Sequence, residues 1–264
     1  MIPVLTLALL RARGRLISLS IGVAVFMFLV GLSYAAVDQN TVRELYESLP
    51  PALKALSGAS DIGSPGGYLG STFIHPVPLV IQGAIAISLA TAPARDLDSG
   101  LAELILSRNL SRRAWLAAHS IATGLSLLLV GLAATAGALV SILVVEDLGS
   151  IALADLAKVG VGTLLTFFSI GGIALLCSAV IRSGARAIGW AAGITMVLYA
   201  LNYLAQVWKI AEPLGPLSLF HYYDPGVILS RGELDARDVV VLALFGVATT
   251  IAAHVVIGHR EIAS

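Results

Sequence analysis

The sequence has little charge and almost no cysteine. Of its 264 residues, 12% are charged and one, Cys177, is a cysteine, which excludes a disulfide framework within the chain. Sixteen basic residues are balanced by sixteen acidic ones, so the net charge gives no sign of nucleic-acid binding. Hydrophobic residues make up 58% of the chain and the mean hydropathy is +0.92, far above soluble globular proteins. The chain therefore belongs in a lipid bilayer.

Two kinds of functional motif are also missing. No Gly-x-x-x-x-Gly-Lys-Ser/Thr phosphate loop occurs, so this chain cannot bind ATP in the usual P-loop manner. Every Asp, Glu, Lys and Arg can be placed at or beyond the edge of an apolar run, whereas ion-coupled transporters usually carry such groups within a span. Aspartyl intramembrane proteolysis would need two buried carboxylates. We therefore expect no catalytic residue, no cofactor site and no metal site in this chain, which we do not expect to be an enzyme.

Six apolar runs are long enough to cross a hydrocarbon core of roughly 30 Å, which needs about 20 helical residues. They cover residues 16–37, 73–91, 115–145, 156–181, 187–207 and 239–257. The sequence therefore predicts an all-α polytopic membrane protein, with residues 1–264 forming a single six-span domain.

Two segments near the N-terminus lie outside these spans. Residues 1–14 are apolar but too short to cross, so we expect a separate interfacial helix there; the alternative is the charged head of a signal peptide. The first span exceeds the roughly 7–15 residues of a secretory signal core, which argues against that alternative. Within the mostly polar residues 38–71, residues 41–49 predict an amphipathic helix that Pro50 and Pro51 stop.

The most informative segment is residues 94–120, between the second and third spans. Asp98 or Ser99 can accept hydrogen bonds from the free amides of a helix that begins near Gly100, and Ser111 can cap the next helix. The apolar residues that then share one face of the first helix are Leu101, Leu104 and Ile105. The pattern predicts a polar elbow containing a short amphipathic helix over residues 100–107.

The elbow reads Asp96-x-x-Ser99-Gly100-x-x-x-Leu104, then Leu-Ser-Arg, one residue, Leu-Ser-Arg and an aromatic. This resembles the cytoplasmic loop of ABC-2 type permeases, the membrane subunits of one class of ATP-binding-cassette exporter. Asn109 stands where the family usually has Pro, and His119 where it often has Lys. The resemblance implies a coupling helix that docks on a separate ATPase subunit. The implied contact residues are Gly100, Leu101, Glu103, Leu104, Arg108, Ser111 and Arg112.

The end of the chain carries a second likeness to the same family. Residues 217–225, a span and a terminal His-Arg-Glu-Ile resemble its closing portion, where the connection before the last span closes the outer exit. Pro213 and Pro216 would suit such a broken segment. The implied outer gate is Phe220, Tyr222 and Tyr223, and the alternative is that these rings are interface anchors.

A stripe of small residues marks the fifth span. Gly189 and Gly193 are one helical turn apart, and Ala185 lies one turn earlier. Small side chains let a second helix approach closely. The stripe is therefore a possible dimer seam, a possible wall of the substrate cavity, or a contact within the subunit.

Orientation follows from the basic residues, which concentrate on the cytoplasmic side of membrane proteins. With both termini in the cytoplasm, ten basic residues lie inside and six outside. The inner set is Arg11, Arg13, Arg15, Arg95, Arg108, Arg112, Arg113, Arg182, Arg186 and Arg260, and the outer set is Arg43, Lys54, Lys158, Lys209, Arg231 and Arg237. We therefore expect a multi-pass protein of the plasma membrane with both termini cytoplasmic.

Taken together, these features favour the permease subunit of an ABC-2 type exporter that moves an apolar or amphipathic substrate. The expected partners are an ABC ATPase subunit holding ATP and Mg, a second permease copy or close relative, and membrane lipid. The first alternative is a six-span anchor or assembly protein without transport. A second is an intramembrane hydrolase that pairs Ser88 with His119 or His254, although we expect hydrogen-bonded structural histidines at these positions.

Overall fold

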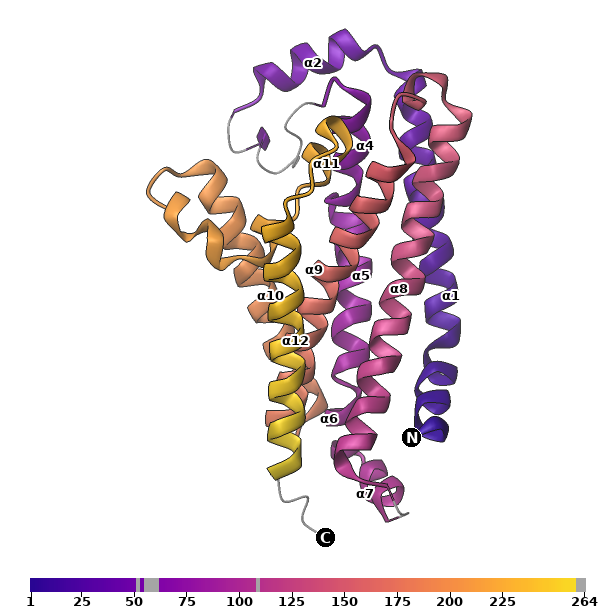
Figure 1. Cartoon of the computed structure of the whole chain (residues 1–264), viewed down its shortest axis with the longest axis vertical. Coiled ribbons are helices and arrows are strands. Elements are labelled where there is room, and N and C mark those ends of the chain that lie inside the picture. The colour runs from indigo at the N-terminus through magenta and orange to yellow at the C-terminus, as the bar shows by residue number, and fades with distance from the viewer. Residues whose placement is uncertain (51–52, 55–61, 108–109, 260–264) are drawn as a thin grey trace.

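Six long apolar helices dominate the computed structural model, which describes residues 1–50, 53–54, 62–107 and 110–259 (Figure 1). They cover Ile2–Ala36, Pro65–Ala90, Arg112–Val144, Leu153–Val180, Gly184–Val207 and Ala236–His259, and each overlaps one of the predicted spans. The described residues contain helices and no strand, so the all-α polytopic fold class is confirmed. Helices suit a bilayer because they satisfy their own backbone hydrogen bonds.

The first helix, α1, runs from Ile2 to Ser33 without a break. A separate interfacial helix over residues 1–14 was expected, and that expectation is wrong. Gly14 is the only residue of low helix propensity at the proposed boundary, and one glycine costs a helix only about 1 kcal/mol. Contact with α8 (Arg112–Val144) stabilises the long helix, and a Cβ atom on Gly137 of α8 would lie 2.1 Å from the carbonyl oxygen of Ala24.

The second span is two helices in line, α4 (Pro65–Phe73) and α5 (Pro76–Ala90). It begins eight residues before the predicted start at Phe73. The glycines in this stretch lie within a helix and allow a neighbouring helix to approach, whereas they were expected to form a loop. A Cβ atom on Gly66 would lie 2.5 Å from the carbonyl oxygen of Leu229, and one on Gly70 would lie 2.5 Å from Gly226 Cα. The glycines therefore allow α4 to touch α11 (Pro225–Arg231).

The α9 helix (Leu153–Val180) has the largest buried share of the six spans and packs along α12 (Ala236–His259). Its polar groups are satisfied by neighbouring backbone: Ser169 Oγ donates to the carbonyl of Leu242 at 2.8 Å. By contrast, α10 (Gly184–Val207) leans away from the other helices over much of its length (Figure 1). The bundle therefore has a packed centre and one loosely attached span.

The two ends of the bundle differ in character (Figure 1). One end, called here the α7 end, holds the start of α1, the short helices α6 (Ala92–Asp98) and α7 (Leu101–Leu106), the α9–α10 connection and the end of α12. The other, the α2 end, holds α4, α11 and the predicted amphipathic helix, observed as α2 (Gln39–Ser48) with Asp38 as its cap. The described members of the predicted inner arginine set lie on elements of the α7 end.

Candidate functional site

The polar elbow at the α7 end consists of two short helices. The predicted helix over residues 100–107 is present as α7, but Asp98 and Ser99 do not cap it, since they belong to the end of α6. Gly100 makes the turn between the two helices with φ of 74°, a left-handed conformation that favours glycine. Ser111 caps α8 as predicted, accepting a hydrogen bond from the amide of Ala114 at 3.2 Å.

The α6 helix is fixed to the connection between α9 and α10. The amide of Ala94 donates to Ser178 Oγ at 2.8 Å, and the amide of Gly184 donates to Asp98 Oδ2 at 3.2 Å. Gly184 lies so close to Arg95 that a Cβ atom on it would be 2.3 Å from Arg95 Cγ. The elbow is therefore packed and hydrogen-bonded against the transmembrane helices, and is not a free loop between them.

The α7 helix has an inner and an outer face. Ala102 is fully buried and Leu101 lines a cavity beneath the helix, whereas Glu103 is exposed and Leu104 is 69% exposed. The predicted contact residues Gly100, Leu101, Glu103, Leu104, Ser111 and Arg112 lie in or beside this elbow, and Arg108 lies outside the described residues. A leucine this exposed in a polar elbow is the kind of side chain that a partner protein covers.

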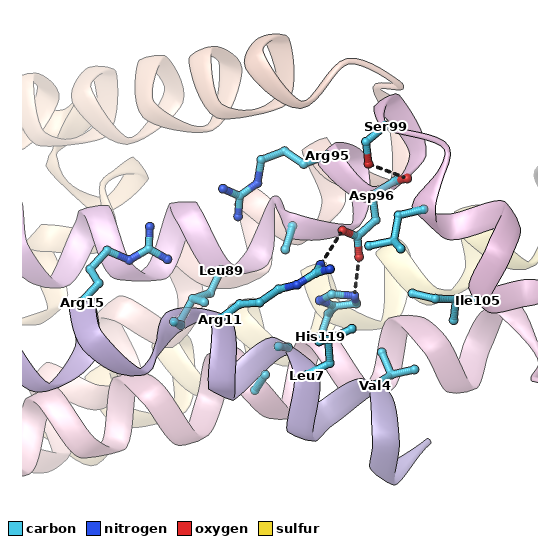
Figure 2. Close-up of a pocket in the computed structure, with 15 residues that line it drawn as sticks. Val4, Leu7, Arg11, Arg15, Leu89, Arg95, Asp96, Ser99, Ile105 and His119 are labelled. Carbon is cyan, nitrogen blue, oxygen red and sulfur yellow. Dashed lines mark hydrogen bonds and ion pairs between the residues drawn. The ribbon is translucent and has the colours of Figure 1, made fainter.

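A cavity of about 510 Å³ lies between α1, α6, α7 and α8 (Figure 2). Its walls combine aliphatic side chains, such as Val4 and Leu7, with charged ones. The polar residues that line it are Arg11, Arg15, Arg95, Asp96, Ser99 and His119. This mixture of an apolar wall and a few polar groups is typical of sites that bind small molecules.

Asp96 joins three helices at the wall of this cavity (Figure 2). Its Oδ2 lies 3.3 Å from Nε2 of His119 on α8, and its Oδ1 lies 3.6 Å from a guanidinium nitrogen of Arg11 on α1. The ring of His119 is also edge-on to Trp115, with 5.6 Å between ring centres. His119 Nε2 forms no hydrogen bond of normal geometry despite the short distance. This cluster was not predicted from the sequence.

Arg95 carries a half-buried charge beside the same cavity. Its guanidinium donates a hydrogen bond to the carbonyl of Ser88. Burial lowers the pKa of Arg95, and the positive charge of Arg15 lowers this pKa further, while Asp96 opposes both effects. Arg15 and Arg95 line the same cavity, so their charges act on one region.

The small-residue stripe of α10 faces away from the rest of the subunit. Ala185, Gly189 and Gly193 are exposed, and a Cβ atom on either glycine would meet nothing within 4 Å. The two glycines therefore do not make the close contact with another described helix of the subunit that was one of the three predicted roles. Trp190 and Met196 are exposed on the same helix, which leaves a broad apolar surface open to another chain or to lipid.

The predicted outer-gate residues lie in a chain segment made of two short 3-10 helices, η3 (Glu212–Leu217) and η4 (Leu219–Tyr222). Tyr222 donates a hydrogen bond to the carbonyl of Pro216 at 2.7 Å, and Phe220 packs edge-on against Tyr199 with ring centres 5.4 Å apart. Tyr223 follows η4 and is buried.

Tyr223 anchors this segment to α9. Its hydroxyl pairs with the hydroxyl of Thr163. Its ring packs against Gly162, where an added Cβ atom would lie 2.7 Å from Tyr223 Cδ2. Burial raises the pKa of the Tyr223 phenol, so it stays neutral and hydrogen-bonded. Tyr223 is therefore fixed in the core, while Phe220 and Tyr222 lie nearer the surface.

The proposed hydrolase residues are engaged elsewhere. Ser88 Oγ donates to the carbonyl of Ile85 at 3.4 Å, and His254 Nδ1 lies 2.9 Å from the carbonyl oxygen of Thr250 in its own helix. His119 faces Asp96, as described above. The described residues contain no group of three or more His, Cys, Asp or Glu placed to hold a metal ion. Ser88 and His254 are thus hydrogen-bonded within their own helices, whereas His119 Nε2 makes no hydrogen bond of normal geometry among the described residues.

The chain matches a known protein family. The family model for the C-terminal domain of the multidrug efflux system permease Rv1217c matches residues 3–260 of this chain. No curated protein matches it.

Proposed function

The chain belongs to the family of this efflux permease domain, and from that membership we propose that it is the membrane subunit of an ABC-2 type exporter driven by a separate ATPase. Membership in the family accounts for six apolar helices and a transport role. The ATPase partner and the ABC-2 class are not part of the family description. The sequence of the elbow and its geometry support both.

The observation that carries the proposal is the outward face of α7. Leu104 and Glu103 project from a helix of six residues, Leu101–Leu106, at the end of the bundle where the described arginines of the predicted inner set gather. An apolar side chain beside a charged one, on a short helix outside the spans, fits a docking surface for a soluble protein. The positive-inside bias supports a cytoplasmic position for this surface and for both termini, on the side where ATP is available.

The attachments of the elbow suggest how force would reach the spans. A push on α7 passes through Gly100 to α6, and α6 is hydrogen-bonded to Ser178 and to the amide of Gly184. Asp96 links α6 to α1 and α8 as well. Because these contacts hold α6 against four spans, docking of an ATPase would move the spans together, as alternating access requires.

The exposed face of α10 supports a second copy of the permease as partner. Ala185, Gly189 and Gly193 offer a surface on which another helix can approach closely, and this surface has no contact within the subunit at the two glycines. Two permeases and two ATPases would then form the working exporter. The Trp208–Tyr223 region at the far end of α10 would close its outer exit, with Phe220 and Tyr222 as the gate and Tyr223 as its anchor.

The test is co-purification from membranes of cells that express the tagged chain. We expect the wild-type chain to bring down a P-loop ATPase, and Leu104→Arg to reduce the recovered ATPase about tenfold or more, since a charge replaces an apolar contact. The matched control is Leu45→Arg, because Leu45 on α2 is 64% exposed at the opposite end. Recovery of equal ATPase with both variants would contradict the assignment of α7, and recovery of none with the wild type would contradict the ATPase.

A further inference from the structure

The cavity at the α7 end carries an excess of positive charge. Arg11, Arg15 and Arg95 line it, and Asp96 is the one carboxylate among the described residues of its wall. Asp96 is engaged with Arg11 and His119, so it does little to balance the other two arginines. The charge of Arg15 and Arg95 is therefore left for something outside the protein chain to balance.

This excess charge is costly where it lies. Arg95 is half-buried, and within the described part of the chain its guanidinium donates to a neutral carbonyl, that of Ser88. Like charges that share a partly desolvated region repel each other, and an anion bound between them would remove that cost. His119 adds a second unsatisfied group, because its buried Nε2 lines the cavity without a hydrogen bond of normal geometry.

The face of α1 that lines the cavity continues along the first span. Beyond Arg15 on this face, the half-buried Leu19 follows at i+4, and the exposed Ser18 and Gly22 follow at i+3 and i+7. Among the described residues, a Cβ atom on Gly22 would meet nothing within 4 Å. The small residues Ser18 and Gly22 thus leave space beside Leu19, and an acyl chain can lie along it.

From these observations we propose that the cavity binds the phosphate headgroup of an anionic phospholipid from the leaflet at the α7 end, held by Arg11, Arg15 and Arg95. Its volume of about 510 Å³ accommodates a headgroup with its glycerol, and the guanidinium groups suit a phosphate because they donate paired hydrogen bonds. Basic pockets between transmembrane helices bind anionic headgroups for the same reason. The acyl chains lie along Ser18 and Gly22.

A bound lipid would touch both α1 and the elbow. Leu101 and Ile105 of α7 form part of the same cavity wall as Arg11 and Arg15 of α1. A headgroup in the cavity therefore contacts the inner face of α7 and stabilises its position. This binding does not depend on an ATPase partner, so it can be tested whether or not the proposed function is correct.

The test uses the 264-residue chain purified in a neutral detergent with whatever subunits accompany it. Dioctanoyl phosphatidylglycerol, dioctanoyl phosphatidylcholine and inorganic phosphate are titrated separately, and bound molecules are counted by native mass spectrometry. We expect one saturable site for phosphatidylglycerol and none for phosphatidylcholine. The double variant Arg15→Gln/Arg95→Gln should weaken phosphatidylglycerol binding about tenfold or more, because it removes two charge-assisted contacts to the phosphate.

The matched control is Arg13→Gln/Arg186→Gln, which removes the same charge from two exposed arginines that do not line the cavity. It should bind phosphatidylglycerol as the wild type does. Ala8→Phe keeps all three cavity arginines and fills the space, since Ala8 lines the cavity, and it should abolish binding even if Arg95→Gln disturbs the fold. Equal weakening in both double variants, full binding to Ala8→Phe, or binding of inorganic phosphate as tight as that of the lipid would overturn the proposal.

Discussion

His119 Nε2 on α8 lies 3.3 Å from Asp96 Oδ2 on α6, and the side chain of His119 is only 4% exposed. The ion pair of Asp96 with Arg11 is longer, at 3.6 Å, and Arg11 is 52% exposed, so solvent screens it. The contact with His119 is therefore less screened by solvent than the pair with Arg11. It connects the elbow that carries α7 to α8, a span of 33 residues.

Asp96→Asn tests this connection. Removing the carboxylate charge should lower the free energy of unfolding by about 2 kcal/mol, because a buried contact with a charged acceptor is weakened. Chemical denaturation in mixed micelles measures the change. Asp147→Asn is the control, since Asp147 is exposed at the α2 end and should have no measurable effect. Equal stability of the two variants would mean that Asp96 does not anchor the elbow.

Gly66→Ala tests the close approach of α4 and α11. Its added methyl group would lie 2.5 Å from the carbonyl oxygen of Leu229, so the helices must separate, at a cost of about 1–3 kcal/mol. The same measurement on Gly124→Ala provides the comparison, because a Cβ atom there meets nothing within 4 Å and alanine favours a helix. A Gly66→Ala variant as stable as Gly124→Ala would show that the two helices do not pack this closely.

The α10 face is tested by cross-linking in the Cys177→Ser background, which removes the chain's one native thiol. Gly189→Cys should give a disulfide-linked pair of permeases under mild oxidation, because two such faces would bring the thiols together. Leu132→Cys on α8, which is 58% exposed, should give none. Cross-linking from position 132 but not from 189 would place the seam on a different helix.

Sidedness is tested with a membrane-impermeant maleimide and the variant Glu103→Cys in the same cysteine-free background. The positive-inside bias predicts labelling in inverted vesicles and protection in intact cells. The variant Glu44→Cys on α2 should behave in the opposite way, since that helix lies at the other end of the bundle. Labelling of position 103 in intact cells would reverse the orientation and remove the basis for an ATPase at α7.

The sequence predicted the features that depend on local chemistry. The apolar runs predicted the six helices. Ser111 predicted the start of α8, because a hydroxyl before a helix accepts hydrogen bonds from its free amides. The start of the second span was predicted too late, because Gly66 and Gly70 are also typical of a loop. Their role in helix contact becomes visible only when the position of α11 is known. A separate helix over residues 1–14 was expected because the apolar stretch before Arg11 is too short to cross a bilayer, but the arginines lie within the continuous helix α1.

The Asp96 cluster could not be predicted from spacing. Its members Arg11, Asp96 and His119 belong to three helices separated by long stretches of chain, and only the packed bundle brings them together. One signal was present: His119 stands where the related loops often have lysine, and a basic partner there would suit a nearby carboxylate. The predicted coupling contacts, dimer face and outer gate stay predictions.

The most direct test of the central claim is photo-cross-linking from the outer face of α7. A photoreactive amino acid at position 104, where the leucine is 69% exposed, is activated in membranes that contain the native partners. The account predicts a covalent adduct between this chain and a P-loop ATPase, with no such adduct from position 45. An ATPase adduct from position 45 and none from position 104 would contradict it.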